Sequence, residues 1–241
     1  IIYKFEKEEF VLERVKKDDF YQVMLQIAIP VSLQSLITSA LNTLDTMMIS
    51  SLGDATIAGV GLANQVFFFF IMICFGISTG SSVMISQYWG RRDARNARRV
   101  NGLSTLISFV LGVIFTLIAI FLPTQILTMM TSDPEVIAEG ALYLKAAAFS
   151  YITAGLSFAL GNSLRSTGDA RTPLIATMVG FVLNAFFNYV FIFGALGFPE
   201  LGVVGAAIGT IIARAVELLI IFYSIKSYDG PLNASVKESL D

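Results

Sequence analysis

Histidine is absent from this sequence, and cysteine occurs once, at Cys74. A chain without histidine lacks the commonest general base and the commonest zinc ligand. A single cysteine cannot form an intrachain disulfide, and Cys74 lies inside an apolar run where a packing role is expected. These absences argue against an enzyme that depends on histidine, on a zinc centre or on a disulfide framework.

Charged residues are also scarce. They make up 14% of the 241 residues, whereas 55% are hydrophobic and the mean hydropathy is +0.74. Soluble domains are usually about a quarter charged. The composition therefore predicts a membrane protein before any motif is considered.

Six apolar runs are each long enough to cross about 30 Å of hydrocarbon as a helix. Only helices satisfy the backbone polar groups of such long apolar runs inside a membrane. The sequence therefore predicts an all-α fold, a polytopic bundle of six transmembrane helices within residues 20–228, preceded by a charged, cytoplasmic N-terminal segment at residues 1–19. The expected spans are roughly 21–50, 56–88, 101–122, 135–163, 172–194 and 203–225.

Positive charge is concentrated in the connections on one side of the predicted bundle. The connections after the second and fourth spans contain arginines, and the three connections on the opposite side contain neither lysine nor arginine. The positive-inside rule therefore places the arginine-containing connections and the N-terminus in the cytoplasm. Nucleic-acid binding is not expected, because the main cluster lies in a short loop between two spans. The arginines are Arg91, Arg92, Arg95, Arg98, Arg99, Arg165 and Arg171.

The first span carries a carboxylate, Asp45, and in the first five spans no other acidic residue lies away from a span end. An ionised carboxylate in hydrocarbon costs about 2.5–3.5 kcal/mol on insertion scales, so such a residue marks a functional site by default. Gln34, Thr38, Asn42 and Asp45 follow one another at steps of four, four and three, which predicts a shared, cavity-lining helix face. A polar seam packed against a neighbouring helix is the alternative.

Two later spans also carry polar residues. Asn184 and Asn188 are one turn apart in the fifth span, where they either line the same cavity as Asp45 or hydrogen-bond across helices. Arg214 and Glu217 in the sixth span are three residues apart, which favours an intrahelical ion pair facing the interior. The sequence leaves any further role of this pair open.

Small residues at a spacing of four predict close helix packing. Gly76 and Gly80 have this spacing in the second span, and Gly205 and Gly209 have it in the sixth.

Motifs for catalysis and cofactor binding are absent from the sequence. It contains no Walker A sequence and no His/Cys cluster with metal-ligand spacing. An intramembrane aspartyl protease would need two facing carboxylates, and only Asp45 lies at a suitable depth. We therefore expect transport across the membrane rather than catalysis, and no cofactor.

Several separated segments resemble one family, the multidrug and toxic compound extrusion (MATE) transporters. The resemblance covers nearly all of residues 20–228. The segments that carry it are LDTMMISSLGDATIAGVGLANQV (44–66), GISTGSSVMISQYWGRRDARNARR (76–99), NSLRSTGDARTP (162–173), LNAFFNYVFIFG (183–194) and GVVGAAIGTIIARAVE (202–217).

The resemblance implies the amino-terminal six-helix lobe of a twelve-helix antiporter, with residues 229–241 as the start of a cytoplasmic linker between lobes. An even number of spans gives two halves with parallel orientation. The partners expected from the resemblance are a C-terminal lobe, or a second copy of this chain, and a small organic substrate. The implied location is the cytoplasmic membrane of a bacterium or archaeon.

The resemblance also assigns roles to single residues. Asp45 matches the carboxylate that binds the coupling ion, H⁺ or Na⁺, and Asn184, Asn188 and Thr210 match the polar network around it. A Na⁺ ion would be held at Asp45, Asn184 and Asn188, and Asn188 departs from the many members that have aspartate there. Pro30 matches the proline at which the first helix bends.

The implied function is cation-coupled export of organic, cationic compounds. Two alternatives stay open. A flippase of lipid-linked precursors from the same superfamily shares the bundle but would be expected to have an arginine-rich cavity. An inert or scaffolding half-transporter would have no transport activity of its own.

Overall fold

The protein, described here from a computed structural model, is mostly helical over the residues that the structure describes, 17–227, and these contain no strand. Helices α1, α2, α3, α7 and α8 are each long and apolar enough to cross a membrane, and α5 and α6 together make a sixth, bent span. The all-α, polytopic fold is thus confirmed, whereas residues 1–16 and 228–241 lie outside the described part. The elements are α1 (Lys17–Ser50), α2 (Asp54–Gly90), α3 (Ala94–Phe121), α4 (Pro123–Thr128), α5 (Pro134–Ala146), α6 (Ser150–Ser166), α7 (Arg171–Phe193), η1 (Ala195–Gly197) and α8 (Gly202–Ser227).

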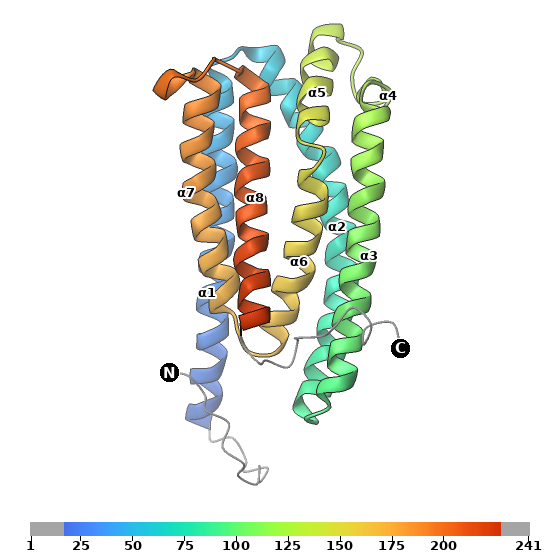
Figure 1. Cartoon of the computed structure of the whole chain (residues 1–241), viewed down its shortest axis with the longest axis vertical. Helices are drawn as coiled ribbons and strands as arrows, with labels where there is room; N and C mark the ends of the chain where they lie inside the picture. Colours follow the sequence, from blue (N-terminus) through green and yellow to red (C-terminus); the bar gives the residue numbers. More distant parts are fainter. Residues whose placement is uncertain (1–16, 228–241) are drawn as a thin grey trace.

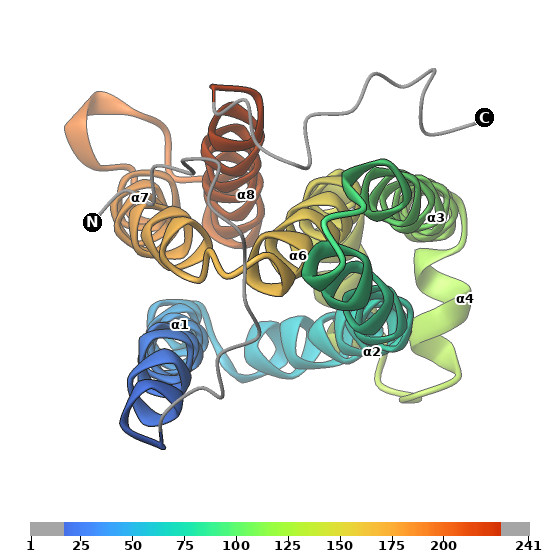
Figure 2. The same ribbon diagram turned by 90° about the horizontal axis from the view of Figure 1, so that it is seen from below.

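The long helices run side by side along the bundle (Figure 1). The α2–α3 and α6–α7 connections lie at one end, which we name the arginine end because arginines lie in the first connection and on both sides of the second. Seen along the bundle, α6 lies between the pair α7 and α8 and the pair α2 and α3 (Figure 2). Helix α1 packs chiefly along α7. This arrangement brings the first, fifth and sixth spans together.

Local sequence signals set several helix ends. Asp93 caps α3 by accepting the backbone N–H of Asn96 at 3.1 Å, and the Asn96 side chain donates to its other oxygen at 2.6 Å. These hydrogen bonds, the side-chain one first, hold the pKa of Asp93 below its usual value. Asp133 caps α5 ahead of Pro134, a favoured first helical residue. Gly194 ends α7 with a left-handed φ of 67°.

The fourth predicted span is broken in the structure. Helices α5 and α6 meet at residues 147–149 with a bend of 58°. The Thr116 hydroxyl of α3 donates to the carbonyl oxygen of Ala148 at 2.9 Å and so satisfies a group that the break releases. Backbone breaks at membrane depth are tolerated where protein groups satisfy them.

The two glycine pairs behave differently. A Cβ on Gly205 would lie 2.5 Å from the carbonyl group of Phe191, so α8 contacts the α7 backbone directly there, and Gly209 lies against the Asn188 side chain. Close packing is therefore confirmed for Gly205 and Gly209. The prediction is wrong for Gly76 and Gly80 within the described residues, because a Cβ at either position would meet nothing within 4 Å.

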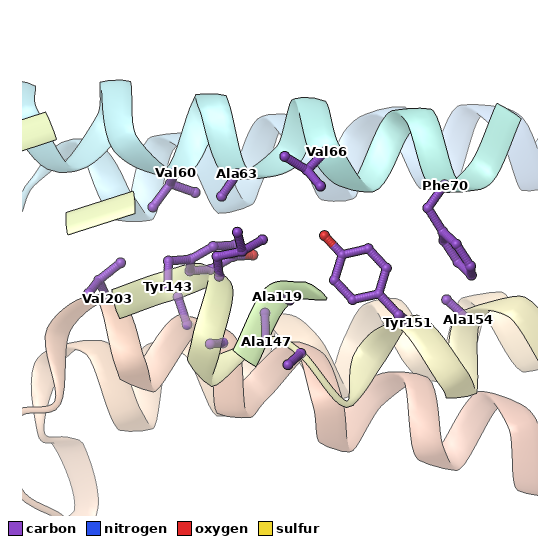
Figure 3. Packing of buried hydrophobic residues seen from close by; sticks show 14 of the residues in the cluster. Val60, Ala63, Val66, Phe70, Ala119, Tyr143, Ala147, Tyr151, Ala154 and Val203 are labelled. Atoms are coloured by element: carbon purple, nitrogen blue, oxygen red, sulfur yellow. The ribbon is translucent and has the colours of Figure 1, made fainter. Parts of the chain in front are cut away.

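A buried cluster joins α2 to the broken α5–α6 span (Figure 3). The Phe70 and Tyr151 rings lie 5.2 Å apart, nearly perpendicular, and Phe115 of α3 lies 5.2 Å from Phe70. Edge-to-face contacts of this kind are favourable beyond the area that they bury. Cys74 is free and fully buried in the same cluster, which confirms its packing role.

Gly59 of α2 tests the contact between α2 and α5. A Cβ at this position would lie 2.6 Å from the backbone nitrogen of Gly140, so we expect Gly59→Leu to push the helices apart and destabilise the bundle by about 1–3 kcal/mol. Thermal unfolding in detergent measures the effect. Gly61→Leu is the control, because a Cβ at Gly61 meets nothing within 4 Å. Equal melting temperatures for the two variants would contradict the prediction.

Candidate functional site

The carboxylate of the first span is held by an asparagine of the fifth. The Asn188 Nδ2 group donates to Asp45 Oδ1 at 2.7 Å and to Asn184 Oδ1 at 3.1 Å. Asn184 Nδ2 in turn donates to Thr210 Oγ1 at 3.3 Å. One polar network therefore connects α1, α7 and α8 at a single depth of the bundle.

The amides of this network are withdrawn from the surface. Asn184 is 1% exposed and Asn188 is 0% exposed. Asn188 Oδ1 is buried without a hydrogen-bond partner and lies against Gly209, where no side chain would fit. A buried amide oxygen without a partner is costly. The network thus contains one carboxylate, that of Asp45, and one amide oxygen, Asn188 Oδ1, that accepts no hydrogen bond.

Tyr143 of α5 belongs to the same site. Its hydroxyl lies near the Thr210 side chain of the network. Tyr143 is 9% exposed and belongs to the core cluster (Figure 3). Tyr143 was not predicted from the sequence, since a lone tyrosine in an apolar helix gives no periodic signal.

A pocket opens beside the network, between α1, α7 and α8. It is small, with about 20 Å³ of room for water-sized groups. Its lining combines hydroxyls, an amide, an arginine and a glutamate with apolar side chains. The lining residues are Thr38, Leu41, Thr177, Gly180, Phe181, Asn184, Thr210, Ala213, Arg214 and Glu217.

A second polar chain borders the pocket on the side of the arginine end. Arg165 Nη1 donates to Gln34 Oε1 at 2.6 Å, and Gln34 Nε2 donates to Thr177 Oγ1 at 2.8 Å. Thr177 Oγ1 donates to Glu217 Oε1 at 2.9 Å, and Arg214 Nη1 pairs with Glu217 Oε2 at 2.8 Å. The predicted ion pair between Arg214 and Glu217 is thus confirmed. The sequence analysis used Arg165 only for orientation and missed its contact with Gln34.

The other predicted site residues of α1 lie in different surroundings. Thr38 lines the pocket and donates to the carbonyl oxygen of Gln34. Asn42 is exposed and does not line this pocket. Eight residues of α-helix place the Asn42 side chain about 80° around the helix axis from that of Gln34, whereas Asp45, eleven residues on, lies within about 20° of Gln34. Helix α1 continues through Pro30 without interruption.

The fold and the polar site together define a multi-span, α-helical membrane protein with a partly buried carboxylate in its first helix. Comparison with known sequences then identifies the family. The MatE family model matches residues 30–190, and the chain belongs to this family.

Named relatives of this chain are multidrug resistance proteins. A probable multidrug resistance protein, YoeA from Bacillus subtilis, is 29% identical over 94% of this chain and 49% of its own length. A probable multidrug resistance protein, NorM from Thermotoga maritima, is 30% identical over 84% of this chain and 44% of its own length. The chain therefore spans about half the length of the curated relatives it matches.

Solved structures show the same arrangement of helices. A multidrug resistance MATE family transporter of the MOP superfamily in an outward-facing conformation superposes with a TM-score of 0.80 at 26% identity. A MOP superfamily transporter from Pyrococcus furiosus, described as having a binding pocket of reverse polarity, also has a TM-score of 0.80 at 26% identity. The match covers 90% of this chain and 48% or 47% of those chains, respectively.

The polar network predicts a measurable contribution of Asn184 to stability. Asn184→Ala removes the hydrogen bonds to Asn188 and Thr210, and we expect a destabilisation of about 1–2 kcal/mol, read as a lower melting temperature in detergent. Asn42→Ala is the matched control, because the Asn42 side chain is exposed and should change stability by less than about 0.5 kcal/mol. A larger loss for Asn42→Ala would show that the network is not stabilising.

Proposed function

We propose that this chain forms one lobe of a membrane antiporter that exchanges a small monovalent cation, H⁺ or Na⁺, for an organic cation. The supporting observation is Asp45, a carboxylate within a membrane-spanning helix that is hydrogen-bonded to a buried amide beside a pocket. Membership of the MatE family and the names of the relatives support drug-like compounds as the substrate and export as the direction of transport.

The composition of the network favours a monovalent ion. Asp45 supplies a single negative charge, and Asn188, Asn184 and Thr210 are neutral. Their oxygens, among them the unpartnered Oδ1 of Asn188, suit a hard cation such as Na⁺, and the carboxylate alone suffices for a proton. In this proposal one H⁺ or Na⁺ neutralises the Asp45 carboxylate for each organic cation released.

Exchange follows from competition for the same carboxylate. An organic cation held near Asp45 leaves when H⁺ or Na⁺ neutralises that charge. Each elementary charge that crosses the full membrane potential supplies about 2.3 kcal/mol per 100 mV. Pro30 removes one backbone hydrogen bond from α1, so the helix can change its bend at low cost when Asp45 is neutralised. MATE structures described as straight and bent both superpose on this chain, with TM-scores of 0.80 and 0.78.

The complete transporter requires a second six-helix lobe, supplied by further sequence or by a second copy of the chain. This follows from the half-length match to the relatives. We place the arginine end in the cytoplasm by the positive-inside rule. Among the residues that line the pocket, Arg214 is the only arginine, which favours an organic cation over the anionic lipid precursor that a flippase would carry.

Asp45→Asn tests the proposal. We expect the variant, expressed from the complete gene in a host without its main efflux pumps, to insert normally but to lose ion-driven efflux of a fluorescent organic cation. The reason is that an uncharged amide binds neither H⁺ nor Na⁺ in place of the substrate. Asp54→Asn, at the exposed start of α2, is the control and should keep its efflux.

Ion replacement in everted vesicles then separates the two coupling ions. Efflux driven by a pH gradient without Na⁺ assigns H⁺, and efflux that requires a Na⁺ gradient assigns Na⁺. Undiminished efflux by Asp45→Asn, with an unchanged response to both gradients, would refute the assignment of Asp45.

A further inference from the structure

Four charged side chains follow one another with alternating sign from the Asp45 network toward the arginine end. Arg214 lines the pocket beside the Asp45 network and pairs with Glu217 at 2.8 Å, and hydrogen bonds through Thr177 and Gln34 connect Glu217 to Arg165. The proposed exchange uses only the first of them, Asp45. A charged group buried in a membrane bundle marks a functional role by default, so the other three need an explanation.

Helix geometry brings Arg214 close to the ion site. Thr210, Arg214 and Glu217 lie on one face of α8, at successive steps of four and three residues. Arg214 is therefore one turn, about 6 Å along the axis, from the threonine that accepts from Asn184. Arg214, Asn184 and Thr210 also line the same pocket. A permanent positive charge thus lines the pocket beside the network that holds Asp45.

Glu217 pairs with this arginine. Glu217 is 7% exposed, and its two oxygens accept from different partners, Arg214 at 2.8 Å and the Thr177 hydroxyl at 2.9 Å. Thr177 is itself fixed by Gln34 of α1. Glu217 is therefore positioned by the Thr177 hydroxyl of α7, which is itself hydrogen-bonded to α1.

We propose that Arg214 is a resident counter-charge that competes with the coupling cation for Asp45, and that Glu217 sets the strength of this competition by pairing with Arg214. The inference rests on the proposed function and adds two positioning residues to it. When Asp45 is ionised, Arg214 is shared between two carboxylates; when a cation neutralises Asp45, Arg214 pairs with Glu217 alone. Together, Arg214 and Glu217 keep the affinity of Asp45 for the coupling cation low enough for that cation to be released.

The charged and titratable groups around Arg214 come from each neighbouring element. Helix α1 supplies Asp45, α5 supplies Tyr143, α6 supplies Arg165 and α8 supplies Glu217. Helix α7 contributes only neutral side chains to the pocket. Among these groups only Glu217 forms an ion pair with Arg214, so a change at Glu217 acts most directly on the competition.

A double-mutant cycle tests the inference on protein purified from the complete gene. Na⁺ binding is measured by calorimetry at high pH, and proton uptake by pH-jump titration without Na⁺. Arg214→Gln should raise the affinity for the coupling cation about tenfold, because a like charge leaves the pocket. Glu217→Gln should lower it about tenfold, because Arg214 then pairs with Asp45 alone.

The two changes together give the decisive comparison. If Glu217 acts through Arg214, Glu217→Gln has no further effect in the Arg214→Gln background. An equal decrease in both backgrounds would show that Glu217 acts by its own charge and would overturn this part of the inference. An unchanged or lower affinity of Arg214→Gln would overturn the competition itself.

Controls separate charge from folding. Arg214→Lys keeps the charge and should bind the cation within about twofold of the unaltered protein. Arg171→Gln removes an exposed arginine at the start of α7 and should have no effect. If Arg214→Gln does not fold, as judged by its melting temperature and elution volume, Arg214→Met supplies the same comparison. Cation binding that survives Asp45→Asn would refute the proposed function, whereas binding lost in Asp45→Asn with no gain in Arg214→Gln refutes only this inference.

Discussion

The hydrogen bond from Asn188 to Asp45 is the interaction on which the site depends. A charged carboxylate in a membrane-spanning helix is stable only where protein groups or water replace its lost hydration. Asn188 does this from α7, and Asn184 and Thr210 extend the network to α8. Helix α1, which packs mainly on α7, is therefore held in place partly by the group that takes part in the proposed exchange. A change of charge at Asp45 acts directly on the packing of the first helix.

Close approach of α7 and α8 makes this network possible. Gly205 brings the α8 backbone against Phe191, and Gly209 leaves room for the Asn188 side chain. Thr210 and Arg214 of α8 consequently face the same pocket as Asn184 of α7. The chain from Arg165 through Gln34 and Thr177 to Glu217 then joins α6, α1, α7 and α8 on the side of the arginine end. Both polar chains thus lie in one region between four helices.

Only part of the fold followed from local pattern. The long apolar runs are sufficient to predict all-α spans, because hydrocarbon leaves helices as the only solution for such segments. The break between α5 and α6 was not predicted, since no proline or glycine marks residues 147–149 and a hydroxyl from α3 satisfies the freed carbonyl group. The close packing predicted at Gly76 and Gly80 is also absent from the described residues. A spacing of four residues permits two helices to approach closely, but it does not determine whether another helix lies there.

The sequence by itself determined that this is a membrane-spanning helical protein with a carboxylate in its first span, because burying a charge in a long apolar run has few physical explanations. It also determined the intrahelical pair of Arg214 and Glu217, whose spacing of three is local. The tertiary structure alone decided that Asn188 reaches Asp45, that Tyr143 meets Thr210 and that Arg165 binds Gln34. Those contacts join residues far apart in the chain, and helix periodicity fixes only which side chains share a face, not which helix that face meets.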